Sequence, residues 1–215
     1  MSTKHRTLPA LEEDYQVLSD TVREFADEVV APVSAELDAK HEFPYEIVAQ
    51  MGEMGLFGLP FPEEYGGMGG DYFALALALE QLGRVNQSVA ITLEAGVSLG
   101  AMPLLKFGTE EQKQRWLPRL ASGELVGAIA MTEPGAGSDL QGIKTTAVKG
   151  GNGYVVNGSK TFITNGYTCN LLIVVARTGE AGSRGLSLIV VETENLPGFR
   201  VGRLLDKIGL HASDT

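Results

Sequence analysis

The chain has 215 residues, 44% of them hydrophobic and 20% charged, and a formal net charge of −10 at pH 7. Such a chain can build one large domain or two small ones around an ordinary hydrophobic core. The acidic balance argues against nucleic-acid binding, which needs a basic surface, so an anionic ligand must be held by local N–H groups and a few placed cations.

The N-terminal stretch, Met1–Arg6, is short and polar and lacks the apolar segment of a secretory signal. No apolar run is long enough to predict a membrane span. We therefore expect a soluble protein of the cytoplasm, or of the mitochondrial matrix if the source is eukaryotic.

Helical periodicity dominates the first half of the chain. Apolar residues at helical spacing predict a first helix that ends at Pro32 and a second that begins at Pro44. These residues are Leu18, Val22, Phe25 and Val29 in the first helix and Ile47, Met51 and Met54 in the second. After a turn-rich connector at residues 61–70, Asp71 is predicted to cap a helix that runs to about Gly83.

Two more helices are predicted to follow. Ser88–Phe107 is mostly apolar or small, which predicts a helix buried on several sides, with a break near Gly96 or near Pro103. The Thr109–Gln112 segment has the pattern of a capping box, which opens another helix with Pro118 near its last turn.

From about Leu125 the hydrophobic period becomes that of strands. The pair Asn157-Gly158 lies between two short β-prone runs, residues 154–156 and 159–163, which predicts a hairpin with its turn at that pair. Two further buried strands are predicted at Leu171–Arg177 and Leu186–Glu192, with a polar turn between them at residues 179–185.

The change of period defines the predicted architecture. The fold class is α+β: an all-α N-terminal domain at residues 1–124, followed by an antiparallel, barrel-like β middle domain at residues 125–215. Because the last residues are polar and carry no terminating element, we expect the middle domain to be incomplete at its C-terminal end.

The segment Ala130–Asp139, AMTEPGAGSD, predicts a strand that ends in a loop whose N–H groups can face an anion such as a diphosphate. Gly135 and Gly137 permit close approach of the backbone, and Ser138 can donate to a phosphate. A turn without a ligand is the alternative for Gly-Ala-Gly-Ser taken alone. The loop lacks the Lys-Ser/Thr pair of a P-loop and the glycine spacing of the dinucleotide fingerprint.

A second segment, Lys160–Gly166, again combines apolar residues with a hydroxyl. Thr132 and Thr164 can donate to the heteroatom edge of a flat heterocycle, and Phe162 can pack beside the ring. The alternatives are β propensity for the threonines and a core position for the aromatic ring. Together the two segments predict the two walls of a flavin site.

No metal site is predicted. Cys169 is the only cysteine, so no internal disulfide can form, and no histidine or cysteine has metal-ligand spacing. We expect Cys169 to be a buried, inert thiol. The three histidines, His5, His41 and His211, are scattered along the chain.

Taken in order, these segments resemble the acyl-CoA dehydrogenase family over nearly the whole chain. The resemblance is nearest to long-chain and isovaleryl-like members, because Phe162 stands where medium-chain members often carry tryptophan. The matching segments are Met131–Asp139, Gly142–Thr145, Asn157–Lys160 and Phe162–Gly166, with support from Pro62–Gly67 and Gly108–Lys113.

The resemblance implies an enzyme that binds FAD and oxidises an acyl-CoA thioester to the trans-2-enoyl-CoA. In the family a glutamate removes the α-proton, hydride leaves the β-carbon for flavin N5, and electrons pass to an electron-transferring flavoprotein. Hydrogen bonds to the thioester carbonyl, in a site closed to water, stabilise the developing enolate. We expect a homo-oligomer, a tetramer or a dimer, when the enzyme is complete.

The resemblance also implies the residues of the site. Those for FAD are Ile129, Met131, Thr132, Gly137, Ser138, Phe162, Ile163 and Thr164. Thr132 would bond the pyrimidine edge and Thr164 would lie near N5. The residues that contact the CoA moiety would be Ser138, Ser183 and Arg184.

The family's C-terminal four-helix domain, which carries the catalytic glutamate, is expected to be absent from this chain. We therefore name no catalytic residue and expect the chain alone to be inactive. Glu133 is interpreted as a structural loop residue rather than the base. Some relatives place a glutamate in the acyl pocket, and Glu94 lies one residue out of register with that position. The alternative is that Glu94 is a carboxylate on the surface of a helix.

Other functions stay open at this point. The chain can be a short protein that binds FAD or acyl-CoA without turnover, or a subunit that completes its site with a partner chain. It can also belong to an enzyme like the related acyl-CoA oxidases, which react with oxygen.

Overall fold

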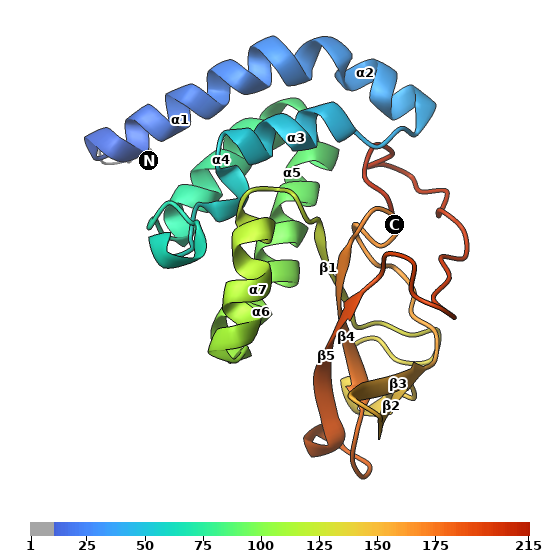
Figure 1. The fold of residues 1–215 in the computed structure, drawn as a ribbon. Coiled ribbons are helices and arrows are strands. Elements are labelled where there is room, and N and C mark those ends of the chain that lie inside the picture. Colours follow the sequence, from blue (N-terminus) through green and yellow to red (C-terminus); the bar gives the residue numbers. More distant parts are fainter. Residues whose placement is uncertain (1–10) are drawn as a thin grey trace, which may run out of the picture.

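The computed structural model describes residues 11–215 and shows a helical region packed beside a sheet (Figure 1). The helices are α1 Glu13–Phe25, α2 Ala31–Lys40, α3 Tyr45–Glu53, α4 Tyr72–Val85, α5 Gln87–Glu94, α6 Met102–Phe107 and α7 Glu110–Ala121. The strands are β1 Gly127–Ala130, β2 Thr146–Gly150, β3 Gly153–Asn157, β4 Leu171–Arg177 and β5 Leu186–Glu192. The predicted α+β class is therefore confirmed.

Pro32 does not end the first helix, contrary to the prediction. A π-helical segment, Ala26–Val30, joins α1 to α2, and Pro32 lies in the first turn of α2. In this wider turn the Ala31 N–H donates to the Ala26 carbonyl. A shift of hydrogen-bond register next to the proline accommodates its ring and its missing donor, so the helical run continues.

The predicted helix caps are confirmed. The Asp71 carboxylate accepts a hydrogen bond of 2.9 Å from the Ala74 N–H at the start of α4. At α7, Gln112 N–H donates to Thr109 Oγ1 (3.3 Å), and Thr109 N–H donates to Gln112 Oε1 (2.9 Å), which completes the capping box. Each cap satisfies N–H groups that have no partner within the helix.

The predicted break in the apolar stretch 88–107 is a π-helical segment, Ala95–Ala101, between α5 and α6. By length and composition Gln87–Phe107 is able to cross a membrane, which corrects the expectation that no apolar run is long enough. However, 67% of this apolar window is buried inside the fold. The protein core therefore accounts for most of its apolar surface.

The sheet is mixed and open, whereas an antiparallel, barrel-like sheet was predicted. Its order is β1-β4-β2-β3, and β5, which is not part of this series, also pairs with β4. β4 runs parallel to β1 and to β2, and antiparallel to β5. Long connections lead from β1 and from β2 to β4, and connections of this length permit parallel pairing.

The predicted hairpin at Asn157-Gly158 is wrong. Asn157 is the last residue of β3, and the turn of the β2–β3 hairpin lies at Gly151 and Asn152 instead. Gly158 has φ +157°, and a Cβ added there would overlap the side chain of Thr145. The chain then leaves the sheet, because Lys160 and Thr161 hydrogen-bond to the loop after β1.

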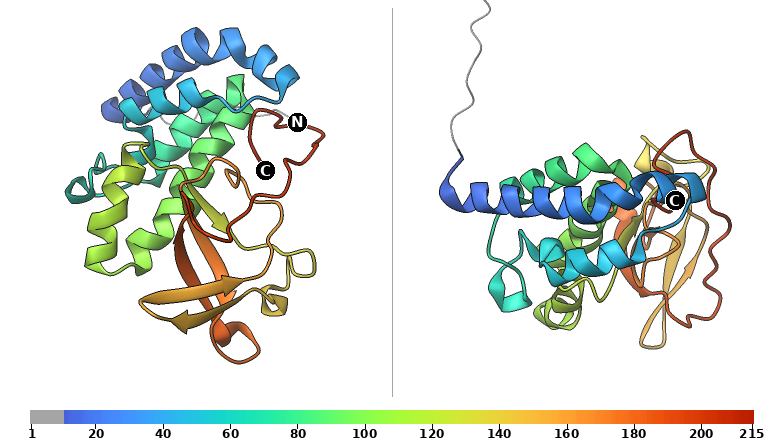
Figure 2. Two further views of the ribbon diagram at one scale, coloured as in Figure 1. Left: turned by 45° about the vertical axis from the view of Figure 1, so that its right-hand side comes forward. Right: turned by 90° about the horizontal axis from the view of Figure 1, so that it is seen from above.

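β4 connects the two halves of the molecule. Its alternating side chains enter different clusters: Leu171 and Ile173 join the core of the helices, while Leu172 and Val174 join a second core within the sheet. Figure 2 shows the helices against one side of the sheet. β1 also lies directly against the π-helical segment, since a Cβ on Gly100 would be 2.5 Å from the Gly127 carbonyl carbon.

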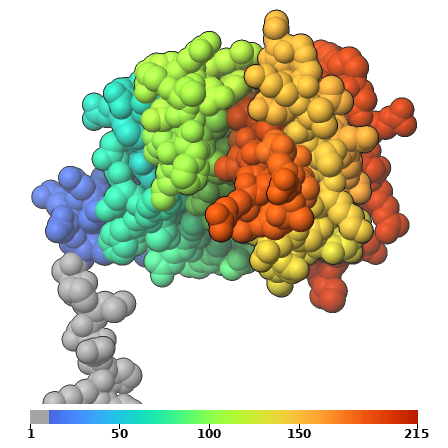
Figure 3. Space-filling model, turned by 90° about the horizontal axis from the view of Figure 1, so that it is seen from below, coloured from blue at the N-terminus to red at the C-terminus, as the bar shows by residue number. Residues whose placement is uncertain are grey.

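The C-terminal segment, residues 193–215, runs back past the sheet toward the end of α2 (Figure 1). The His211 ring stacks on the His41 ring at 4.2 Å between centroids, and His211 Nδ1 lies 3.2 Å from Asp38 Oδ2. Ala212, Ser213 and Asp214 are buried. In Figure 3 this segment lies beside the β2–β3 hairpin on the underside of the molecule.

Candidate functional site

The loop that follows β1 presents open backbone. Glu133 and Ala136 close a tight turn through hydrogen bonds of 2.9 and 3.1 Å between their backbone groups. Gly135 and Gly137 are exposed, and a Cβ added to either would meet no atom within 4 Å. Ser138 is exposed beside them. This geometry leaves room for a ligand to approach the backbone of the predicted anion-binding loop.

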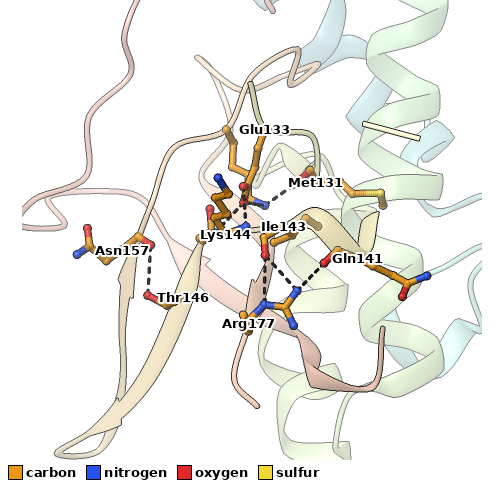
Figure 4. A network of polar contacts seen from close by, with 10 residues as sticks. Met131, Glu133, Gln141, Ile143, Lys144, Thr146, Asn157 and Arg177 are labelled. Atoms are coloured by element: carbon orange, nitrogen blue, oxygen red, sulfur yellow. Dashed lines mark hydrogen bonds and ion pairs between the residues drawn. The ribbon is translucent and has the colours of Figure 1, made fainter. Parts of the chain in front are cut away.

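The base of this loop is held by the Glu133 carboxylate (Figure 4). It accepts hydrogen bonds from Lys144 N–H (2.8 Å), Thr145 N–H (2.9 Å) and Lys160 Nζ (2.9 Å). Burial of Glu133 opposes its ionisation, but hydrogen bonds from Thr145, Lys144 and Lys160 outweigh burial and lower the pKa of Glu133 to about 2. A buried carboxylate with these partners suits a structural role and not that of a general base.

The second predicted wall lies against the first. Lys160 Nζ donates to the Met131 carbonyl (2.9 Å), and Thr161 N–H donates to the Thr132 carbonyl (2.9 Å). These bonds bring the segment 160–164 alongside the loop after β1. The structure therefore brings together Met131 and Thr132 from one wall and the chain leading to Phe162, Ile163 and Thr164 in the other.

Phe162 has an unusual conformation for an aromatic residue. Its φ is +60°, in the left-handed region that favours glycine, and its side chain is 67% exposed. Because the ring is exposed, its packing within the described residues does not account for this backbone strain. Strain of this kind collects at ligand sites, where an exposed ring can pack against a bound flat group.

Asn165 and Asp214 were not predicted from the sequence as site residues, yet both hold the second wall. Asn165 is fully buried with φ +60°, and its Nδ2 donates to the carbonyls of Thr92 (3.1 Å) and Gly127 (3.4 Å). The Asp214 carboxylate accepts the N–H groups of Tyr167 (2.8 Å) and Thr168 (2.7 Å). The signal that could have identified Asn165 is the Gly166 that follows it, since an Asn-Gly pair favours a turn with a left-handed residue.

Burial raises the pKa of Asp214 above its usual range, although the N–H groups of Thr168 and Tyr167 favour its charged form. No feature of the local sequence marks this residue, because its partners lie more than forty positions earlier in the chain. Cys169, in the same region, is buried as predicted, and burial raises the pKa of its thiol to about 12. Its thiol is therefore unsuited to nucleophilic chemistry.

The predicted CoA contacts lie on exposed loops. Ser138 follows the glycine turn after β1, while Ser183 and Arg184 begin a short 3₁₀ turn before β5. Arg177, at the end of β4, hydrogen-bonds to carbonyls of both loops. Ile129 lies within β1, where it is half-buried and pairs in register with Ile173.

Glu94 does not belong to this cluster of loops. It is half-buried at the end of α5, where it lines an open groove of about 500 Å³ between α4 and α5. Arg84 and Gln87 line the same groove. Within residues 11–215, no group of three His, Cys, Asp or Glu side chains is placed to hold a metal ion.

The described residues fit the binding of a flavin dinucleotide. Open glycine backbone and the Ser138 hydroxyl offer donors to a diphosphate, and the exposed Phe162 ring offers a flat apolar surface. Thr132 and Thr164 are partly exposed, so their hydroxyls are available to a polar ring edge. Among residues 11–215, no atom lies within 4 Å of a Cβ added at Gly135 or Gly137.

Known protein families and relatives match this chain over most of its length. The family model "Acyl-CoA dehydrogenase, N-terminal domain" matches residues 12–124, and "Acyl-CoA dehydrogenase, middle domain" matches residues 128–215. An acyl-CoA dehydrogenase of Bacillus subtilis is 43% identical over 195 residues, which are 90% of this chain and 51% of that protein. The chain thus spans about half the length of the curated relatives that it matches.

Two solved structures share the fold. A chain from work on the electron transferring flavoprotein of Acidaminococcus fermentans is 45% identical, with a TM-score of 0.93 over 97% of this chain and 55% of that chain. An acyl-CoA dehydrogenase of Bacillus anthracis, solved in complex with FAD, is 37% identical, with a TM-score of 0.86 over 95% of this chain and 35% of that chain. With family models over most of its length, the chain belongs to the acyl-CoA dehydrogenase family.

Proposed function

We propose that this chain carries the flavin and coenzyme A contacts of an FAD-dependent acyl-CoA dehydrogenase. The observation that carries the proposal is the pairing of the two walls, in which Lys160 and Thr161 hydrogen-bond to Met131 and Thr132. The family membership of the chain, and the FAD bound to its Bacillus anthracis relative, support it.

In this proposal the two walls orient the cofactor. The N–H groups around Gly137 and the Ser138 hydroxyl hold the diphosphate, and Thr132 donates to the pyrimidine edge of the ring. Phe162 and Ile163 flank the ring, and Thr164 donates near N5. Ile129 and Met131 complete the apolar lining at the end of β1. When bound, FAD would accept the hydride from the β-carbon of the acyl group.

The substrate in this proposal is an acyl-CoA thioester, which is converted to the trans-2-enoyl-CoA. Ser138, Ser183 and Arg184 bind the CoA moiety, because hydroxyl and guanidinium donors suit its phosphates. We assign no catalytic base among residues 11–215, since the hydrogen bonds to Glu133 commit its carboxylate to the fold. The proposed electron acceptor is an electron-transferring flavoprotein, in line with the related chain from Acidaminococcus fermentans.

Titration of the purified chain with FAD tests the flavin site. We expect the chain to bind FAD with a shifted visible spectrum, and the Thr132→Val and Thr164→Val variants to bind it about tenfold more weakly. Thr146→Val is the matched control, because Thr146 is exposed on β2, outside both walls. A chain that does not take up added FAD, or variants that bind like the wild type, would contradict the proposal.

A further inference from the structure

Arg177 makes an extensive set of contacts with main-chain oxygens (Figure 4). Nε donates to the Ile143 carbonyl (3.2 Å), and Nη2 donates to the carbonyls of Gln141 (2.8 Å) and Ile143 (3.1 Å). Nη1 donates to the carbonyls of Glu180 (2.8 Å) and Gly182 (3.1 Å). Every nitrogen of the guanidinium group is therefore used.

These carbonyls belong to two different loops. The first loop, residues 139–143, directly follows Ser138, and the second loop, residues 180–185, contains Ser183 and Arg184. In the part of the chain that the structure describes, only the Arg177 side chain hydrogen-bonds to both loops. The sheet does not join them, because β4 and β2 pair only at Thr146 and Arg177 before they diverge.

The second loop is packed closely around the guanidinium group. A Cβ added to Gly185 would lie 3.1 Å from Arg177 Nη1 and would overlap the Glu180 carbonyl. The loop is also closed on itself, since the N–H groups of Thr178 and Gly179 donate to the Gly185 carbonyl (2.9 and 3.1 Å). Arg177 therefore binds the backbone of a loop that is already held together by its own hydrogen bonds.

The charge of Arg177 is not neutralised by an acid. Between residues 11 and 215 the ion pairs involve other cations, and the partners of Arg177 are all carbonyls. In a chain of net charge −10, a positive charge between two loops raises the local affinity for an anion. Arg184 adds an exposed cation within the second loop.

We propose that Arg177 is a positioning residue for the nucleotide end of coenzyme A: it sets the separation of the two loops that carry Ser138 on one side and Ser183 and Arg184 on the other. The inference rests on the proposed function, since it takes those residues as CoA contacts. The planar fork of arginine reaches carbonyls in both loops at once. Lysine carries the same charge on a single nitrogen and cannot do so.

The test compares Arg177→Lys and Arg177→Met with wild type in the full chain. Dissociation constants are measured by calorimetry for butyryl-CoA and for S-butyryl-pantetheine, which lacks the phosphorylated nucleotide. We expect both variants to bind butyryl-CoA about tenfold more weakly and to change pantetheine thioester binding less than about twofold. Arg200→Met is the control, because Arg200 is exposed in the C-terminal segment.

Hydrogen exchange without any ligand gives a second readout. We expect Arg177→Lys to exchange faster at residues 139–143 and 180–185, with β4 and β5 unchanged. Unchanged exchange in both loops, or equal losses for the two thioesters, would overturn the role of Arg177. Wild type that fails to bind butyryl-CoA, while the two loops still open in Arg177→Lys, would instead refute the proposed function and the CoA part of this inference with it.

Discussion

Lys160 Nζ lies 2.9 Å from Glu133 Oε1, and the two side chains are only 10% and 8% exposed. The pair joins the loop after β1 to the segment that leads to Phe162. Lys160 also donates to the Met131 carbonyl, and Glu133 also accepts two backbone N–H groups. A buried ion pair therefore sets the spacing between the two walls of the proposed flavin site.

Removing one member of this pair is expected to destabilise the protein strongly. Lys160→Met leaves the Glu133 carboxylate buried without its cation, at a cost of about 3 kcal/mol in the free energy of unfolding. The double variant Glu133→Gln/Lys160→Met is expected to recover part of this loss. Urea denaturation measures both effects, and FAD titration of the folded variants shows whether the walls still bind the cofactor.

The matched control is the exposed pair of Arg119 and Glu124, whose side chains are 43% and 57% exposed. Arg119→Met is expected to cost less than about 1 kcal/mol, because water screens the surviving charge. Equal losses in Lys160→Met and Arg119→Met would show that burial of the Glu133–Lys160 pair has no energetic consequence.

Glu133 is also expected to make stability depend on pH. Its pKa is lowered from 4.5 to about 2 in the folded protein, so folding favours the ionised carboxylate. The stabilisation is present above the unfolded pKa and is lost as the pH falls through the folded pKa. By about pH 3, wild type should have lost about 2 kcal/mol of stability through this group alone.

The measurement is the free energy of unfolding of wild type and of Glu133→Gln between pH 6 and pH 3. Because glutamine does not titrate, the difference between the two proteins should shrink as the pH falls. Parallel curves over this range would mean that Glu133 does not titrate differently in the folded and unfolded states.

Phe162 is expected to reduce the stability of the protein without ligand. Its φ of +60° is costly for a non-glycine residue, and its exposed ring gains little from burial. Phe162→Gly should therefore raise the free energy of unfolding by about 1 kcal/mol and weaken FAD binding. Thermal unfolding and FAD titration measure the two effects in one preparation.

Asn165→Gly provides the comparison, because Asn165 has the same φ of +60° but is buried and donates to Thr92 and Gly127. Its loss of hydrogen bonds should outweigh any relief of strain, so this variant is expected to be less stable than wild type. If Phe162→Gly is destabilised as much as Asn165→Gly, the strain assigned to Phe162 is absent.

Two glycines should respond in opposite ways to a methyl group. Gly100→Ala places a Cβ 2.5 Å from the Gly127 carbonyl carbon, so β1 must move, with a loss of about 2 kcal/mol. Gly137→Ala meets no atom within 4 Å and should leave stability unchanged or slightly higher. We expect Gly137→Ala nevertheless to weaken FAD binding, and normal binding would argue against a diphosphate at this backbone.

Local sequence determined much of the secondary structure. The caps at Asp71 and Thr109 bind backbone N–H groups within three positions of the capping residue. The bounds of β4 and β5 follow from short runs of apolar residues in the local sequence. The two segments proposed to bind the flavin were also recognisable, since each combines turn residues with a hydroxyl. Their roles as FAD contacts stay a prediction.

Tertiary structure decided what depends on distant partners. β1 lies parallel to β4 and packs against the π-helical segment at Gly127, while the run after Gly158 leaves the sheet because Lys160 pairs with Glu133, 27 positions earlier. Arg177 joins two loops that lie 34 to 36 residues upstream and 3 to 5 residues downstream. Neither interaction can be predicted from local sequence, because the neighbours of a residue do not indicate which distant donor or acceptor it will meet once the chain folds.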